Sequence, residues 1–245
     1  MCYGPRLADI LTVLARSTGS GCEDPRFIHM EVEKEFMRRY TIPLALSLAL
    51  VSAAGAAKAV SLSHVHDGFY LRMELGFGYM HAPASLKVND VSADLTISGF
   101  GAGGGIQLGG TVARGLVVGG ATQGFVVSSP KASADGASVT MDGSANMFLV
   151  GPFLAYYPDP TNGLNFGGLI GYAGFYGTED NGETTETDTG LGISAWLGHD
   201  WWVSDEWSLG IAGRISWAHV SYSQGGYSET VDVFTPAVLF TATYH

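Results

Sequence analysis

Three residues near the end of the chain combine the types of side chain that transfer acyl groups. His219 and Ser221 are separated by one residue, so both would lie on the same face of a β-strand. A histidine that accepts the serine proton makes the hydroxyl a nucleophile, and a carboxylate orients that histidine. Glu229 follows Ser221 and is the candidate carboxylate. Because Ser and His are also common where a strand ends, an esterase is one hypothesis, and the main interpretation assigns no catalytic residue.

Three charged residues share a face with small residues on two alternating segments. Arg72 and Glu74 lie in segment 67–80, and Arg214 lies in segment 207–217. The small neighbours leave room for these side chains, while the opposite face of each segment is apolar. Buried charges need partners. We therefore expect Glu74 to pair with Arg72 or Arg214 across an enclosed interior, as a structural pairing rather than a gate.

Two acidic segments, 179–183 and 186–188, offer carboxylate oxygens of the kind that bind Ca²⁺. They lack the spacing of an EF-hand, so we interpret them as a solvated, negatively charged loop. His64 and His66 form a pair without a third ligand in view. The glycine run 103–105 does not precede a helix, which argues against a phosphate-binding loop. We expect no metal site and no cofactor.

Composition excludes several classes of protein for the part of the chain beyond residue 60. Residues 61–245 contain 17 Asp and Glu but only five Lys and Arg. Five scattered cations cannot neutralise a phosphate backbone, so nucleic acid is not an expected partner. Both cysteines, Cys2 and Cys22, lie upstream, which excludes a disulfide framework or a Cys-ligated metal from this part.

The N-terminal region predicts an export signal. Residues 37–59 begin with Met-Arg-Arg, continue with an uncharged apolar run and end with Ala-Lys-Ala, the form of a signal-peptidase site. The apolar run is shorter than the roughly 20 residues that a membrane-spanning helix needs. We interpret 1–36 as a mis-called start or a non-native extension, and 60–66 as a short N-terminal segment before the main domain, 67–245.

Apolar residues recur with a period of two over most of 67–245, which indicates β-strands. Together with 67–80 and 207–217, six further segments make eight candidate strands: 94–109, 116–127, 144–157, 163–177, 189–203 and 230–244. Strands of about ten residues are long enough to cross a bilayer at a tilt. The connections alternate between short turns (111–115, 158–162 and 204–206) and longer polar loops (82–93, 128–143, 178–188 and 223–229).

Aromatic residues gather near the ends of the candidate strands, as they do where a membrane protein meets the two bilayer interfaces. The expected girdle residues are Tyr79, Tyr157, Trp201, Trp207, Trp217 and Tyr244. The fold that follows is all-β: a transmembrane, antiparallel, up-and-down β-barrel of eight strands. Glycine occupies both faces of 94–127, so the sequence does not assign which face of that part points inward.

The signal peptide, the eight glycine-rich amphipathic strands and the aromatic final strand resemble the small OmpA/OmpX-type outer-membrane β-barrels of Gram-negative bacteria. The last strand resembles the signal read by the barrel-assembly machinery, although His245 follows the final aromatic, Tyr244. The resemblance implies an outer-membrane monomer in contact with lipids and lipopolysaccharide. His219 and Ser221 also resemble the His-x-Ser pair of membrane-embedded lipid A deacylases, although the residues after Ser221 depart from that motif.

The leading function is a structural or surface-interaction role, in which acidic, polar extracellular loops contact envelope components or an outside partner. The alternatives are a narrow channel for small solutes and a lipid A deacylase-like membrane esterase.

Overall fold

The computed structural model describes residues 68–245, apart from 89–90, 135, 179–183, 185–187 and 225–226. The expectations for the extension 1–36, the signal peptide 37–59, the segment 60–66 and most of the acidic loop lie outside the described residues. Within the described part, no helix is long and apolar enough to cross a membrane.

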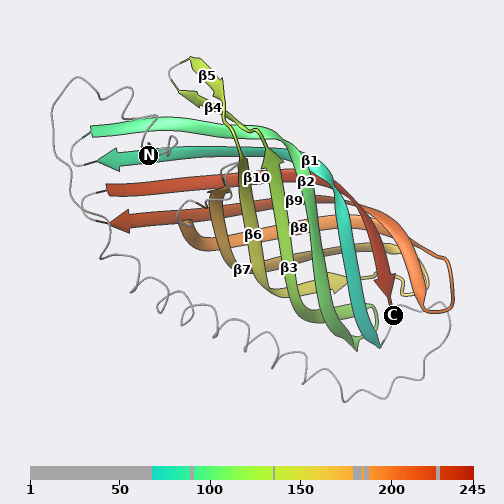
Figure 1. Ribbon diagram of the computed structural model, residues 1–245. Helices are drawn as coiled ribbons and strands as arrows, with labels where there is room; N and C mark the ends of the chain where they lie inside the picture. Colours follow the sequence, from blue (N-terminus) through green and yellow to red (C-terminus); the bar gives the residue numbers. More distant parts are fainter. Residues whose placement is uncertain (1–67, 89–90, 135, 179–183, 185–187, 225–226) are drawn as a thin grey trace. The chain divides into compact units, whose positions relative to one another are not determined.

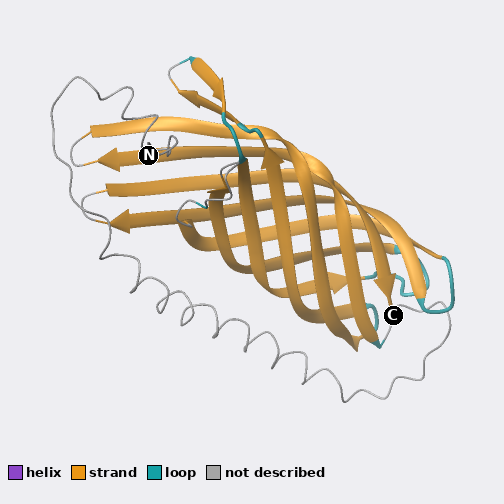
Figure 2. Cartoon of the chain, viewed as in Figure 1, coloured by secondary structure: helices purple, strands orange, loops and turns teal. Residues whose placement is uncertain are grey.

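The described chain folds into ten β-strands (Figures 1 and 2). Their bounds are β1 Phe69–Val88, β2 Val91–Ala113, β3 Leu116–Ser128, β4 Lys131–Ala134, β5 Ala137–Thr140, β6 Ser144–Tyr156, β7 Leu164–Thr178, β8 Asp188–Trp202, β9 Trp207–Gln224 and β10 Tyr227–Tyr244.

Eight of these strands close into a ring. Each pairs antiparallel with its neighbour in the order β1, β2, β3, β6, β7, β8, β9 and β10, and β10 pairs back with β1. The short hairpin β4–β5 lies outside the ring and joins β2 at Thr96–Ser98. The predicted antiparallel, up-and-down barrel of eight strands is confirmed.

Alternation along each strand separates an apolar outside from a filled inside. On β9, Leu209, Ile211 and Ile215 point outward and are 51%, 45% and 53% exposed. The even-numbered residues between them point inward, and Arg214 is 3% exposed. In β2 and β3, where glycine hid the pattern, the odd-numbered residues face inward: Gln107 and Gln123 are 0% and 2% exposed.

Two of the expected long loops are mainly strand, so that part of the prediction is wrong. Only residues 89–90 separate β1 from β2, and only 225–226 separate β9 from β10. Alternation continues through these segments, and their polar side chains occupy one face of a strand rather than a loop. The hairpin β4–β5 lies within the expected loop 128–143.

The extended ends of β1, β2, β9 and β10 form a four-stranded sheet that continues past the ends of β3 and β6 (Figure 1). We call this part, residues 81–88, 91–98, 218–224 and 227–234, the raised wall. Its inward side chains are small or apolar and are at most 3% exposed: Ala82, Ala84, Leu86, Ile97, Ala218, Val220, Val231 and Val233. Its exposed outer residues are mostly polar: His81, Pro83, Ser85, Lys87, Ser92, Asp94, His219, Ser221, Ser223 and Phe234. The raised wall therefore reverses the polarity of the barrel beneath it.

Candidate functional site: the lumen cluster and the outer surface

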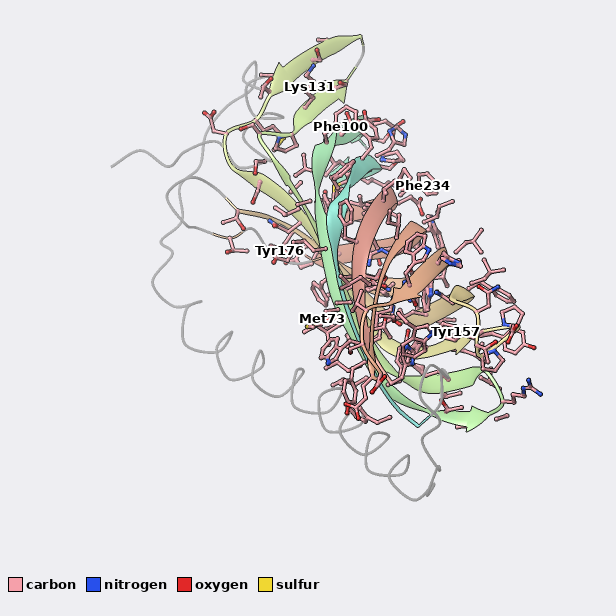
Figure 3. All side chains as sticks on the ribbon, turned by 90° about the vertical axis from the view of Figure 1, so that its right-hand side faces the viewer. Met73, Phe100, Lys131, Tyr157, Tyr176 and Phe234 are labelled. Carbon is pink, nitrogen blue, oxygen red and sulfur yellow. The ribbon has the colours of Figure 1, made fainter. Side chains whose placement is uncertain are left out.

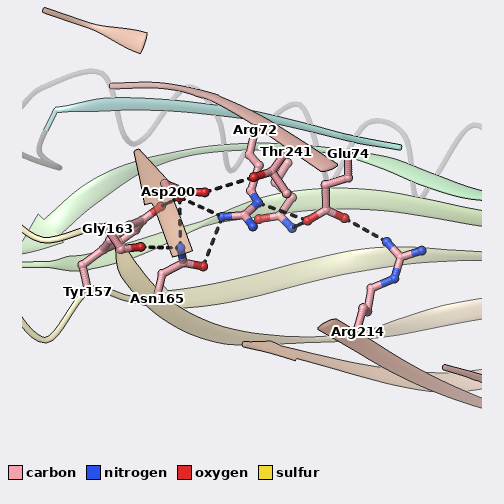
Figure 4. Close-up of polar contacts among 9 residues, drawn as sticks. Arg72, Glu74, Tyr157, Gly163, Asn165, Asp200, Arg214 and Thr241 are labelled. Atoms are coloured by element: carbon pink, nitrogen blue, oxygen red, sulfur yellow. Dashed lines mark hydrogen bonds and ion pairs between the residues drawn. The ribbon is translucent and has the colours of Figure 1, made fainter. Parts of the chain in front are cut away.

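A charged cluster lies inside the ring (Figure 4). It is in the half nearer the short turns, since Asp200 is two residues before the end of β8. Arg72 is fully buried at its centre. Its Nε donates to Glu74 Oε1 over 3.2 Å. Its Nη1 donates to Asn165 Oδ1 over 3.1 Å and to Asp200 Oδ2 over 3.2 Å. One guanidinium thus ties together β1, β7 and β8 from inside the ring.

The two carboxylates of the cluster accept hydrogen bonds from side chains on several further strands. Arg214 Nη1 donates to Glu74 Oε2 over 2.8 Å, and Gln107 Nε2 donates to Glu74 Oε1 over 2.9 Å. The Asp200 carboxylate accepts from Tyr157, Asn165 and Thr241, each over 3.0 Å. Two guanidinium groups and two carboxylates give this cluster a formal charge of zero, so it does not present an unpaired charge to a passing ion.

Glycines on the inner wall make the space for these side chains. A Cβ at Gly198 would lie 3.3 Å from Arg72 Nη2. A Cβ at Gly210 would overlap the Asp200 carboxylate. The long charged side chains therefore fit inside the ring only because these neighbouring inner positions are glycine.

An apolar plug occupies the lumen beyond the cluster, toward the raised wall. Its members come from four strands and are at most 7% exposed: Phe125, Met147, Leu149, Phe175 and Leu239. Together with the neutral cluster, these side chains fill the interior, as expected for a ring of eight strands.

The structure brings the three expected lumen charges, Arg72, Glu74 and Arg214, into one cluster. Alternation along 163–177 and 189–203 puts Asn165 and Asp200 on the inner face, but it does not identify them as partners of Arg72. Tyr157 does not belong to the aromatic girdle: it is 0% exposed and donates to Asp200. The odd-numbered positions of β6 face inward, and Tyr157 continues that series just after the strand ends.

The other expected girdle residues lie on the outside, in two groups. Near the short turns, Trp201 is 53% exposed, and the rings of Trp207 and Tyr244 meet edge-on at 5.3 Å. Near the raised wall, Tyr79 contacts Phe100 at 5.1 Å, and Trp217 stands opposite Phe234. Figure 3 shows Phe100 and Phe234 toward the raised wall, with Tyr157 at the opposite end.

The structure does not bring His219, Ser221 and Glu229 together as a triad. His219 and Ser221 lie on the outer face of β9, whereas Glu229 falls on the inward-facing series of β10. The carboxylate next to the histidine is Asp232, with His219 Nδ1 and Asp232 Oδ1 3.0 Å apart. Sequence spacing missed Asp232 because the residue opposite His219 depends on the register of the β9–β10 hairpin.

A closed ring with an apolar outer belt, aromatic bands at both edges and an interior filled by a charged cluster and an apolar plug defines a transmembrane β-barrel. The fold is similar to that of the outer membrane protein OprG from Pseudomonas aeruginosa (TM-score 0.47, 14% identity, covering 75% of this chain and 100% of that one). It is also similar to Neisserial surface protein A (TM-score 0.42, 14% identity, covering 72% and 96%). A third similar structure is the outer membrane protein AlkL in lipid bilayers (TM-score 0.38, 15% identity, covering 77% and 94%). No protein-family model and no curated protein sequence matches the chain.

Proposed function

We propose that the protein is a monomeric outer-membrane barrel whose raised wall acts as a structural or surface-interaction element outside the membrane. The reversed polarity of the raised wall carries this proposal. A polar outer face and a buried apolar inner face suit a sheet that stands in water, next to a barrel that stands in lipid. The wall thus offers contact surface to lipopolysaccharide sugars or to an outside partner, while the belt contacts outer-membrane lipids.

The filled lumen supports a structural role over a narrow channel. The Arg72–Glu74–Arg214 pairing and the apolar plug leave no charged group free to guide an ion through the described interior. We expect no steady conductance when the folded protein is inserted into planar lipid bilayers. Reproducible single-channel steps that scale with the amount of inserted protein would favour the channel instead.

Two lysines provide a test of orientation. Lys87 and Lys131 are the only lysines beyond residue 60, and both are exposed. Lys87 lies in the raised wall and Lys131 pairs with Ser98 at its edge (Figure 3 labels Lys131). A membrane-impermeant amine reagent added to intact cells should label both. The K87R/K131R variant is the control, because it should keep the fold but lose side-chain labelling on this part of the chain. Labelling only after the cells are opened would place the raised wall in the periplasm and would contradict the proposed surface-interaction role.

The esterase is the second candidate, because an outward histidine does have a carboxylate partner in Asp232. Mass spectrometry of lipid A from cells with and without the protein tests it. We expect identical acyl-chain patterns. A missing acyl chain that reappears in the Ser221→Ala variant would establish the esterase.

A further inference from the structure

The lipid-facing surface of the barrel is hollowed next to β9. The hollow has a volume of about 720 Å³ and is lined mainly by apolar groups. Phe77, Tyr79 and Phe100 border it on one side and Leu197 on the other, with Gly213 between them. The outer belt of a barrel is normally convex, so a hollow of this size within it needs an occupant.

The sheet register explains the depth of the hollow. Gly213 stands between Leu197 of β8 and Val238 of β10, so a side chain is missing from the middle of a row of three. A Cβ built at Gly213 would meet no atom within 4 Å. In the next outward row, Ile215 has the small Ala195 on one side and Pro236 on the other.

Pro236 also interrupts the hydrogen-bonded ladder at the edge of the hollow. Strands β1 and β10 pair at Gly78–Ala237 and again at His81–Phe234, but not at the two positions between. Proline has no backbone N–H to donate, which is why it is rare inside sheets. The break lies at the level of Tyr79, whose ring contacts Phe100 in the aromatic band. The break therefore lies at the end of the hollow that is nearest the aromatic band.

We propose that the hollow binds one acyl chain of a membrane phospholipid, with the headgroup end of the lipid toward Tyr79 and the aromatic band. Bilayer hydrocarbon is the medium that surrounds this belt, and a flexible chain can follow a narrow apolar hollow. The site is on the lipid-facing surface of the barrel. It does not depend on the surface-interaction role proposed for the raised wall.

A photoactivatable phosphatidylethanolamine, with a diazirine on one acyl chain, tests this site in vesicles of phosphatidylethanolamine and phosphatidylglycerol. Irradiation of the reconstituted full barrel should concentrate cross-links on peptides of β8, β9 and β10 around Leu197, Gly213 and Val238. Gly213→Leu fills the hollow and should reduce that labelling to the level of the rest of the belt.

Gly120→Leu is the matched control. Gly120 also faces outward, and a Cβ there also meets nothing within 4 Å, but it does not line the hollow. This variant should label like the original protein. If Gly213→Leu fails to show the gel shift of a folded barrel, Ala195→Leu fills the same hollow and decides the question. Even labelling over the whole belt, unchanged labelling in the filled variant, or protein–protein cross-links at these residues would overturn the proposal.

Discussion

The barrel and the raised wall share strands but reverse their polarity. On β10, Phe240 points into lipid and Thr241 points into the lumen. Further along the same strand, Asp232 lies on the outer face and Val231 and Val233 are buried inside. Along this one strand the outward residues therefore change from apolar to mainly polar, while its pairing with β9 stays continuous.

This difference shows where the membrane ends. The change occurs just beyond Trp217 and Phe234, which stand opposite each other on β9 and β10. Aromatic rings favour the interface between hydrocarbon and water. The outer face is thus apolar below this pair and mainly polar above it.

The largest expected effect comes from the charge cluster, which the raised wall lacks. Glu74→Gln leaves two buried guanidinium groups with one carboxylate between them, and losing one partner of a buried ion pair costs about 3–5 kcal/mol. Equilibrium unfolding in lipid vesicles measures this loss. The double variant E74Q/R214M restores the charge balance and should be more stable than E74Q alone. Equal stability of E74Q and the original protein would show that the cluster does not hold the ring together.

A charge placed on the outside should separate the two regions by a smaller amount. Ile211→Arg puts a cation in the lipid belt, at a cost of about 2–4 kcal/mol near the bilayer midplane. Ser221→Arg is the control on the outer face of the raised wall, where the cation meets water and the free energy of unfolding should barely change. Unfolding of both variants in vesicles provides the comparison, and equal costs would refute the assigned membrane boundary.

The inward residues are apolar in the raised wall and partly polar in the barrel. Two substitutions that exchange these residue types test this difference. Val231→Thr buries an unpaired hydroxyl in the apolar face of the raised wall, at about 1–3 kcal/mol. Thr241→Val removes a hydrogen bond to Asp200, at a similar cost of about 1–3 kcal/mol. Vesicle unfolding measures Thr241→Val, and limited proteolysis of the wall measures Val231→Thr. Stabilisation by either exchange would contradict the polarity described here.

The smallest effect belongs to the exposed pair on the wall. His219 and Asp232 have side chains that are 51% and 46% exposed. An exposed ion pair contributes about 0–1 kcal/mol, so Asp232→Asn should leave stability nearly unchanged. High salt should remove any difference that unfolding at low salt reveals. A loss of several kcal/mol would mean that this pair has a further role.

The alternation of apolar residues was enough to predict the barrel and the inward face of most of its strands, although glycine left the faces of β2 and β3 unassigned. Leu75 and Arg72 fall on opposite faces in any register. The extensions were misread because polar residues such as Ser85 and Lys87 were taken as loop, although Ala84 and Leu86 continue the period of two. The period of two continued through these segments, but the apolar residues moved to the inner face. This change could have shown that the strands extend.

The sequence did not predict which side chains contact one another inside the lumen. Alternation tells which side chains enter the lumen, but Arg72 reaches Asn165 and Asp200 across the ring, at heights set by strand tilt and register. Tyr157 was misplaced because it lies after the end of β6, where a face is assigned only by continuing the strand. The contact between His219 and Asp232 likewise depends on a hairpin register that polar turn residues do not fix.

The pairing of the first and last strands has a consequence for how the molecule folds. β1 meets β10 from Leu71–Tyr244 to Val88–Tyr227, the most distant contacts in sequence among the ring strands. Such non-local pairings are slow to form, because the intervening chain must be ordered first. Arg72 and Glu74 arrive with β1 and reach residues on β7, β8 and β9. The charge cluster therefore joins the first strand to three strands across the ring, and all of its contacts exist together only in the closed ring.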